Sequence, residues 1–218
     1  SGGHPIVYGD HLKAGKDKPT VVIYGHYDVQ PVDPIELWKS QPFEPEVRGD
    51  FLYGRGASDM KGQVMASIYA IDALLQAGEL DLNIKWLIEG EEEIGSPNLA
   101  SFIKKYQDKF ACDFALNPDG GMLGADIPSI PYSLRGLLAI EINVTGPTID
   151  LHSGMFGGAV LNPANELARL VGNMHDENGR ITIPGFYDDV AEMDEAERKE
   201  LAKLPMDEDF YIKNSGAK

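Results

Sequence analysis

A histidine and an aspartate that could serve a metal ion stand directly after an apolar run at residues 21–23. The run predicts a buried strand, because it is β-branched and lies between Pro19 and Gly25. Beyond the end of such a strand, the two-residue spacing would aim His26 and Asp28 the same way. A histidine that binds a metal ion is usually oriented by a second acceptor. The pair therefore predicts a metal ligand with its orienting carboxylate, although a surface histidine beside a turn aspartate would give the same pattern.

Asp59 stands just before a predicted helix, whose apolar residues recur at helical spacing over 64–75 until Gly78 ends the pattern. An aspartate at this place commonly caps the helix through its side chain. However, Gly54 and Gly56 permit a close backbone approach, and the amides around a helix start would hold a carboxylate. Asp59 is therefore interpreted either as an N-cap or as a carboxylate that bridges two cations.

An acidic segment follows the next predicted strand, which covers residues 83–88. The segment places four carboxylates within the five residues 89–93, where like charges repel and no run of Lys or Arg lies beside them. A divalent cation would relieve this repulsion, whereas the alternative is a solvated acidic loop. Beyond the segment, Ser96 and Pro97 predict the N-cap and the first residue of another helix.

A third predicted strand, at residues 113–116, is also followed by an acid. Taken alone, this acid is an ordinary turn aspartate. Each of the three apolar strands, however, is followed by a histidine or by acids. These residues are His26, Glu92, Glu93 and Asp119. Predicted strands and helices alternate along this part of the chain, which indicates an α/β fold. In open α/β sheets, ligands bind outside the carboxyl ends of the strands. We expect a mainly parallel sheet with flanking helices, and at its edge a nitrogen and oxygen site for zinc, manganese or cobalt.

The composition of the 218 residues is that of a globular protein, with 43% hydrophobic residues and a net charge of −16. This negative charge argues against nucleic acid and anionic membranes as partners, since such contacts rest on an excess of Lys and Arg. No apolar run is long enough to cross a bilayer. The single cysteine, Cys112, excludes an internal disulfide and favours a reducing compartment, so we expect a cytoplasmic location.

The hydrophobic pattern divides the chain into a first domain at 1–135 and a second at 136–218. In the second, apolar and polar residues alternate over 138–144, as in an antiparallel strand with one buried face. A helix is then predicted from Asn162 and Pro163. We therefore expect the second domain to be the start of a smaller α+β domain, while the first domain contains the predicted metal site.

Four motifs share a characteristic order and spacing. They lie at residues 25–31, 54–62, 89–96 and 150–154. In this order they resemble the di-metal aminoacylase/carnosinase superfamily of metallopeptidases, most closely its cytosolic nonspecific dipeptidase branch, and the resemblance covers essentially the whole chain. It implies an incomplete phosphorylase/hydrolase-like zinc-peptidase catalytic core in the first domain and the first part of a lid or dimerisation domain in the second.

The resemblance also implies a set of metal ligands. It implies two divalent metal ions, zinc foremost, with manganese or cobalt as alternatives. His26 and Asp119 would hold one ion, and Glu93 would hold the other. Asp59 would bridge both ions, and its peptide bond to Met60 would be cis.

Catalytic roles follow from the same resemblance. Asp28 would orient His26, and Glu92 would be the general base, taking a proton from the water that bridges the metal ions and passing it to the leaving amine. His152, in the lid domain, would reach the site of the partner subunit of a homodimer and stabilise the oxyanion. An aspartate at Asp119 is typical of the family's amino- and dipeptidases, which implies a hydrolase for dipeptides or short peptides.

The chain departs from the family pattern in its ligand set. The second metal ion of the family needs a further histidine, which no residue after His152 supplies, and His175 matches no motif. We therefore expect part of a longer protein that is inactive by itself, with only the His26, Asp59 and Asp119 position complete. Two alternatives stay open: a deacylase of N-acyl amino acids, of the acetylornithine or succinyl-diaminopimelate type, and a non-catalytic association module.

Overall fold

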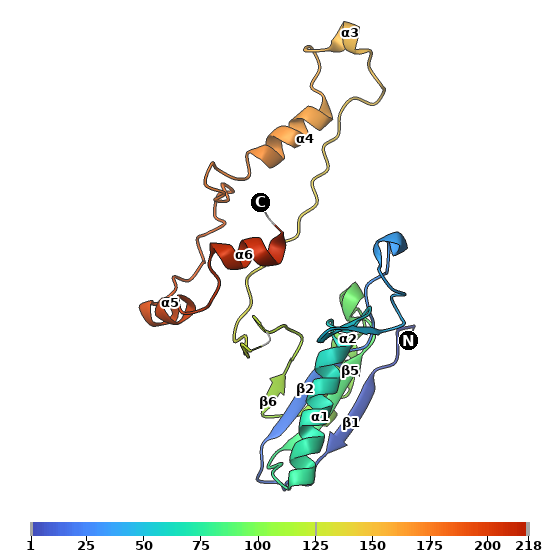
Figure 1. The fold of residues 1–218 in the computed structure, drawn as a ribbon. Helices are drawn as coiled ribbons and strands as arrows, with labels where there is room; N and C mark the ends of the chain where they lie inside the picture. Colours follow the sequence, from blue (N-terminus) through green and yellow to red (C-terminus); the bar gives the residue numbers. More distant parts are fainter. Residues whose placement is uncertain (1, 125, 217–218) are drawn as a thin grey trace. The chain divides into compact units, whose positions relative to one another are not determined.

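In the computed structural model, which describes residues 2–124 and 126–216, the chain forms two compact units. The first is Ser1–Arg135 and the second is Gly136–Lys218. Figure 1 shows the strands and the longest helix in the first unit and shorter helices in the second. The catalytic and lid roles of these units stay predictions.

The first unit is built on a mixed sheet of four strands. These are β1 (Val7–His11), β2 (Thr20–His26), β5 (Asn83–Glu89) and β6 (Phe114–Leu116), in the order β1-β5-β2-β6. β2 runs parallel to β5 and β6, whereas β1 pairs antiparallel with β5 at one edge (Figure 1). The predicted α/β fold with a mainly parallel sheet is confirmed. Because β2, β5 and β6 run in the same direction, their carboxyl ends meet at one edge of the sheet.

Helices cover both faces of this sheet. The cluster under α1 (Lys61–Ala77) consists of Val21, Ile23, Ile84 and Ile71. The cluster under α2 (Leu99–Lys105) and the 3₁₀ turn Gln107–Phe110 consists of Val22, Leu87, Phe110 and Phe102. Successive residues of a strand point to opposite faces, so the apolar run of β2 contributes to both clusters. Each fully buried side chain of this size stabilises the fold by about 1.5–3 kcal/mol, which makes β2 the anchor of the sheet.

The side chain of Asp59 does not cap α1. The N-cap residue is Met60, which makes no side-chain capping hydrogen bond, and the helix begins at Lys61. The Asp59–Met60 peptide bond is cis, as the resemblance implies. Gly78 ends the helix as predicted, in the left-handed conformation with a φ of 72°. Of the two interpretations of Asp59, the capping one is therefore wrong.

The helix start predicted at Ser96 and Pro97 is also wrong. α2 begins at Leu99, with Asn98 as its N-cap residue. Ser96 instead has a φ of 51°, and its hydroxyl donates to the Glu89 carboxylate at 2.7 Å. The serine hydroxyl is engaged by the acidic segment and is not available to cap the helix.

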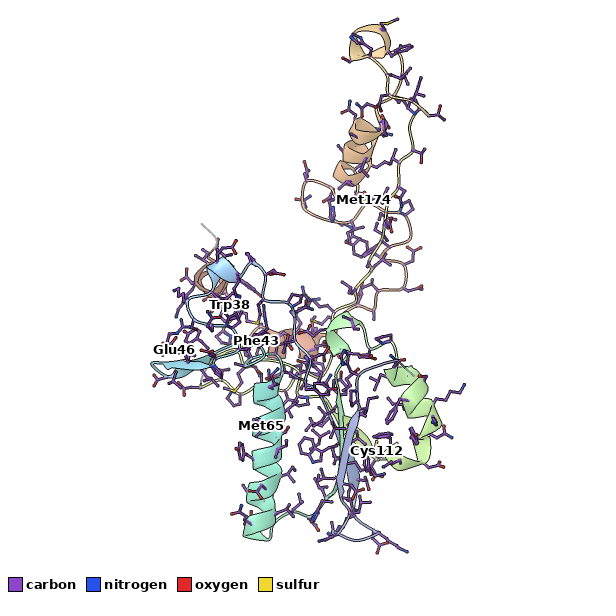
Figure 2. All side chains as sticks on the ribbon, turned by 90° about the vertical axis from the view of Figure 1, so that its right-hand side faces the viewer. Trp38, Phe43, Glu46, Met65, Cys112 and Met174 are labelled. Carbon is purple, nitrogen blue, oxygen red and sulfur yellow. The ribbon has the colours of Figure 1, made fainter. Side chains whose placement is uncertain are left out.

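The segment between β2 and α1 contains little regular structure. It includes a 3₁₀ turn at Ile35–Leu37 and a hairpin of β3 (Glu46–Arg48) and β4 (Phe51–Tyr53). Trp38 donates its indole N–H to the Val32 carbonyl at 2.9 Å, and the Arg55 guanidinium lies 5.0 Å from its ring centre. Phe43, labelled with Trp38 in Figure 2, is 66% exposed. The segment is therefore stabilised by the contacts of Trp38 and not by burial of Phe43.

The second unit consists of helices joined by irregular chain. They are α3 (Ser153–Phe156), α4 (Pro163–Gly172), α5 (Glu195–Leu201) and α6 (Glu208–Ser215). α4 begins as predicted, with Asn162 as a side-chain cap and Pro163 as its first residue. Across the described parts of the chain, no helix has both the length and the apolar character that a membrane span requires.

The strand predicted at 138–144 is wrong. These residues form no regular structure, and Leu138 is 66% exposed. A strand is stable only when neighbouring strands bond its backbone and cover its apolar face. The described residues of the second unit offer no such strand, and their only bridge joins His175 to Ile181. The alternating pattern therefore has no sheet to join within this unit.

Candidate metal centre

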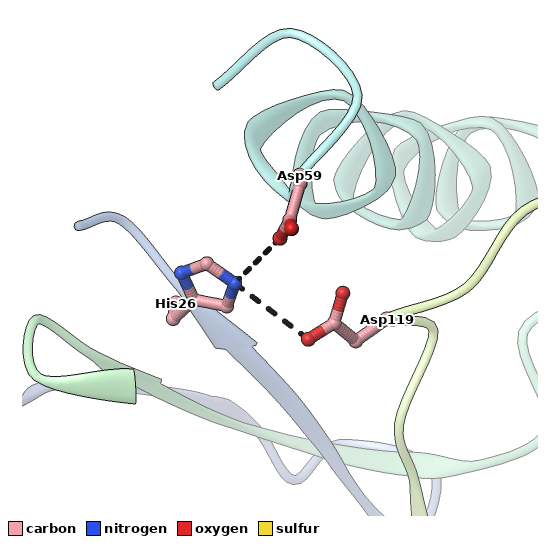
Figure 3. Close-up of side chains that lie close together, drawn as sticks. All are labelled: His26, Asp59 and Asp119. Atoms are coloured by element: carbon pink, nitrogen blue, oxygen red, sulfur yellow. Dashed lines mark hydrogen bonds and ion pairs between the residues drawn. The ribbon is translucent and has the colours of Figure 1, made fainter. Parts of the chain in front are cut away.

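Three predicted ligands converge at the carboxyl end of β2 (Figure 3). His26 is the last residue of β2 and is fully buried, whereas Asp59 precedes α1 and Asp119 follows β6. The His26 Nε2 atom lies 3.0 Å from Asp59 Oδ1 and 3.6 Å from Asp119 Oδ2. One candidate ligand atom from each residue lies within 4.8 Å of the other two. One imidazole nitrogen and two carboxylates form a donor set that fits a divalent cation such as zinc.

A close approach of α1 to β2 places Asp59 at this edge. Gly25 faces the first turn of α1, and a Cβ atom on it would lie 2.6 Å from Val64 Cγ2. Any larger residue at Gly25 would push the start of α1 away from the strand. The glycine therefore permits the close approach of α1 to β2.

Asp28 orients the imidazole of His26. The His26 Nδ1 atom lies 3.0 Å from the main-chain oxygen of Asp28 and 3.3 Å from its Oδ1 atom. Nδ1 therefore carries a proton towards Asp28, and Nε2 faces the other carboxylates. Burial lowers the pKa of His26, but the hydrogen bonds to Asp28 and Asp59 and the charge of Asp119 outweigh burial and raise it. The same negative charge would attract a cation to Nε2 in place of a proton.

Glu92 supplies a further carboxylate beside these residues. It lies on the 3₁₀ turn Glu92–Ile94 that follows β5, and its Oε2 atom is 3.8 Å from His26 Nε2. Burial raises the pKa of Glu92; His26 opposes this rise, and the neighbouring carboxylates add to it. Burial and the charge of Asp59 likewise raise the pKa of Asp119. The site holds more negative charge than its single histidine can balance, which a divalent cation would relieve.

Glu93 lies at the same edge but outside the group of three ligands. Its main-chain N–H donates to Asp28 Oδ2 at 2.9 Å. Its carboxylate accepts hydrogen bonds from the Gln30 main-chain N–H at 3.0 Å and from Gln30 Nε2 at 2.7 Å. The loop that follows β2 therefore holds Glu93 through both its backbone and its side chain.

The two other acids of the segment have partners of their own. Glu89 is 1% exposed and accepts hydrogen bonds from the Tyr24 and Ser96 hydroxyls, both at 2.7 Å. Glu91 accepts hydrogen bonds from the Asn98 side chain on both carboxylate oxygens, and these lower its pKa. Local donors therefore satisfy Glu89 and Glu91, neither of which was predicted to be a site residue.

The sequence profile described as Peptidase family M20/M25/M40 matches residues 22–206. The chain belongs to this family. Its membership in the M20/M25/M40 peptidases confirms the superfamily that the four motifs indicate.

Several members of the M20/M25/M40 family are similar to the chain along most of its length. Beta-Ala-His dipeptidase of Mus musculus is 38% identical over 213 residues, which cover 95% of this chain and 42% of that protein. Cys-Gly metallodipeptidase DUG1 of Candida albicans is 38% identical over 200 residues, covering 88% of this chain and 41% of that protein. The solved structure of the M20 family metallo-carboxypeptidase Sso-CP2 from Sulfolobus solfataricus matches with a TM-score of 0.78 and 40% identity, covering 100% of this chain and 49% of that one. The chain thus spans less than half the length of each of these M20/M25/M40 proteins.

His152, the remaining predicted site residue of this M20/M25/M40 chain, lies in the second unit. It precedes α3, and its Nδ1 atom accepts a hydrogen bond from the Gly154 N–H at 3.0 Å. This contact fixes the imidazole at the start of a short helix. A catalytic role for His152 stays a prediction.

Two glutamines that the sequence analysis did not select hold the edge together. Gln63, on the first turn of α1, donates to the Gly120 carbonyl at 3.1 Å and ties the helix to the loop after β6. Gln30 binds the Glu93 carboxylate. The place of Gln30 inside the motif at 25–31 was a signal that could have found it. Gln63 gave no signal, because a glutamine on a helix surface is ordinary.

Proposed function

We propose that the protein that contains this chain is a metal-dependent hydrolase that cleaves the peptide bond of dipeptides or short peptides. The observation that supports this most is the convergence of His26, Asp59 and Asp119 at the sheet edge of a peptidase-family chain. Glu92 lies beside them and supplies a carboxylate for proton transfer. The names of the mouse and Candida relatives support dipeptides as substrates.

In this proposal two divalent cations, zinc foremost and manganese or cobalt as alternatives, bind at the edge of the sheet. His26 and Asp119 would hold one cation and Glu93 the other, with Asp59 shared between the two. The mixed nitrogen and oxygen donors and the raised pKa values of Glu92 and Asp119 support this assignment. When bound, such cations lower the pKa of water and polarise the scissile carbonyl.

Glu92 is the proposed proton carrier of the reaction. Its carboxylate takes a proton from the attacking water and passes it to the leaving amine as the peptide bond breaks. A raised pKa suits this role, because the group must both accept and release a proton near neutral pH. Asp28 holds the imidazole of His26 so that Nε2 faces the site.

The second unit is proposed to act as a lid and dimerisation domain. His152, from the lid of one subunit of a homodimer, stabilises the oxyanion in the site of the other subunit. We also propose that the enzyme is cytoplasmic, with small peptides as its substrates; the lone Cys112 is compatible with a reducing compartment.

Substrate length distinguishes this proposal from its rivals. The purified full-length protein would be assayed with dipeptides, with tetrapeptides and with N-acetyl and N-succinyl amino acids. Dipeptides should be cleaved fastest. Preferential release of the C-terminal residue from longer peptides would instead match the carboxypeptidase activity named for Sso-CP2. Preferential release of acetate or succinate would favour the deacylase alternative.

Metal removal tests the reaction class. Dialysis of the full-length protein against a chelator should abolish dipeptide hydrolysis, and added zinc, manganese or cobalt should restore it. Activity that survives complete metal removal would contradict the proposal. An absence of hydrolysis for every substrate class, with or without metal, would favour a non-catalytic association module.

A further inference from the structure

Gln30 makes an unusually complete set of contacts with one acid. Its main-chain N–H donates to Glu93 Oε1 at 3.0 Å, and its Nε2 atom donates to Glu93 Oε2 at 2.7 Å and to the Glu93 carbonyl at 3.4 Å. We propose that Gln30 is a positioning residue that holds the Glu93 carboxylate in the orientation in which it binds a divalent cation. This inference rests on the proposed function, in which Glu93 is a metal ligand.

The contacts fix the orientation of the Glu93 carboxylate and not merely its location. Each of its two oxygens receives a hydrogen bond from a different N–H of Gln30, so the carboxylate cannot rotate without losing one. The Glu93 main-chain N–H is held by Asp28 Oδ2 at 2.9 Å. The main chain and the carboxylate of Glu93 are therefore both anchored to the loop after β2, the strand that ends in His26.

Cation binding is compatible with these hydrogen bonds. An ionised carboxylate has about four lone-pair positions, so two accepted hydrogen bonds leave others for a cation. The Gln30 amide is neutral and does not compensate the charge of Glu93. A lysine or arginine at this place would neutralise the carboxylate and repel the cation. The two partners of Gln30 Nε2, the Glu93 main-chain oxygen and its Oε2 atom, are both acceptors, so the amide group must present its nitrogen, and not its oxygen, to Glu93.

The position of Gln30 argues against a purely structural role. The residue is exposed, and both its main-chain N–H and its side-chain amide donate to Glu93. Exposed residues outside the core usually change stability little when replaced. Partners that orient metal ligands, in contrast, typically change metal affinity by about 10–100-fold when removed.

The test compares Gln30→Met with Gln76→Met in the full-length protein, by titrating each metal-free protein with zinc in a calorimeter. Methionine has nearly the length of glutamine but donates no hydrogen bond. Gln76 is a matched control, because its Nε2 atom donates to Asp72 Oδ2 at 2.6 Å on the exposed surface of α1. We expect two zinc ions in the wild type and in Gln76→Met. In Gln30→Met, one zinc ion should bind as in the wild type, while the dissociation constant of the other rises about 10–100-fold.

The outcomes separate this inference from the proposed function. If the wild type binds two zinc ions and Gln30→Met binds both with unchanged affinity, the inference about Gln30 is wrong and the proposed function stands. If the wild type binds fewer than two zinc ions, or Glu93→Gln still binds two as tightly, the metal assignment itself fails and the inference fails with it. A lower thermal unfolding temperature of metal-free Gln30→Met, with both zinc sites weakened equally, would indicate a structural role and also overturn the inference.

Discussion

The acidic segment 89–93 contains two pairs of glutamates whose surroundings differ. Glu89 and Glu91 receive hydrogen bonds from hydroxyl and amide groups of neighbouring elements, and both are buried. Glu92 and Glu93 face the end of β2, where further carboxylates raise the pKa of Glu92 beyond the effect of its burial. The same residue type is thus held by local donors at two positions and, in our proposal, serves the metal centre at the other two.

The difference teaches that the side to which an acid faces decides whether a cation can reach it: Glu93 also accepts amide hydrogen bonds, from Gln30, but lies at the end of β2 beside the other candidate ligands. A carboxylate satisfied by hydroxyl or amide donors keeps its charge in place and stabilises the loop. Neighbouring acids disfavour the ionised form of a carboxylate, which a positive charge beside it would offset. Variants of the two pairs should therefore have opposite consequences for metal content and for stability.

The largest effect is expected from Glu92→Gln. The amide cannot accept the proton of the attacking water, so turnover of dipeptides should fall by roughly 10²–10⁴-fold or more. Zinc content should stay at the wild-type level, because in our proposal Glu92 is not a ligand. The measurement is steady-state hydrolysis together with elemental analysis of the purified full-length protein.

Glu93→Gln is the matched control for this prediction. It makes the same change of glutamate to glutamine at the next residue of the same turn. Here, unlike in Glu92→Gln, the affinity for zinc should fall. Near-normal turnover in Glu92→Gln, or loss of zinc from it, would reverse the roles of the two residues.

A smaller effect, on stability alone, is expected from Tyr24→Phe. Burial and the hydrogen bond to Glu89 raise the pKa of Tyr24, so its hydroxyl stays protonated and donates. Removing this donor from a buried carboxylate should lower the free energy of unfolding by about 1.5–3 kcal/mol. Tyr69→Phe, at a side chain that is 65% exposed, should change it by less than about 0.5 kcal/mol. Urea denaturation of the metal-free proteins measures both changes in the free energy of unfolding. Loss of zinc binding in Tyr24→Phe would contradict the assignment of Glu89 to the fold and not to the metal centre.

The smallest effect concerns Glu91 and pH. The hydrogen bonds from Asn98 lower the pKa of Glu91 in the folded protein, so the unfolded chain binds this proton more tightly. The resulting stabilisation is present above the unfolded pKa of about 4.3 and is lost as the pH falls through the lower folded value. Glu91→Gln should therefore be less stable than the wild type at pH 7 and should lose less stability on acidification below about pH 4.3. A parallel pH dependence in the two proteins would contradict the assignment.

Much of the first unit could be predicted from the sequence. The apolar runs that became β2, β5 and β6 are short and followed by polar residues, those of β2 and β5 are largely buried, and the parallel arrangement of the three strands brings His26 and Asp119 to one edge. The helix after Asp59 was marked by its apolar spacing and by Gly78. These features succeeded because local pattern and tertiary burial agree there.

The failures occurred where the partner of a residue lies outside the element predicted for it. Ser96 was predicted to cap a helix, but its hydroxyl serves Glu89. Residues 138–144 alternate like a strand, yet the described part of their own unit offers no strand to pair with. The contacts of Glu93 with Gln30 and Asp28 depend on how the loops after β2 and β5 meet, which no local pattern encodes.

The most direct test of the metal centre is anomalous diffraction at the zinc edge from crystals of the full-length protein grown with zinc. We expect two zinc peaks beyond the carboxyl end of β2. One should lie about 2.0–2.2 Å from His26 Nε2, and Asp59 should contact both. Glu92 should contact neither ion, whereas Glu93 should bind the second. Two zinc peaks bound elsewhere, or an edge of the sheet that stays without zinc while Asp59 and Asp119 turn away from His26, would contradict the account.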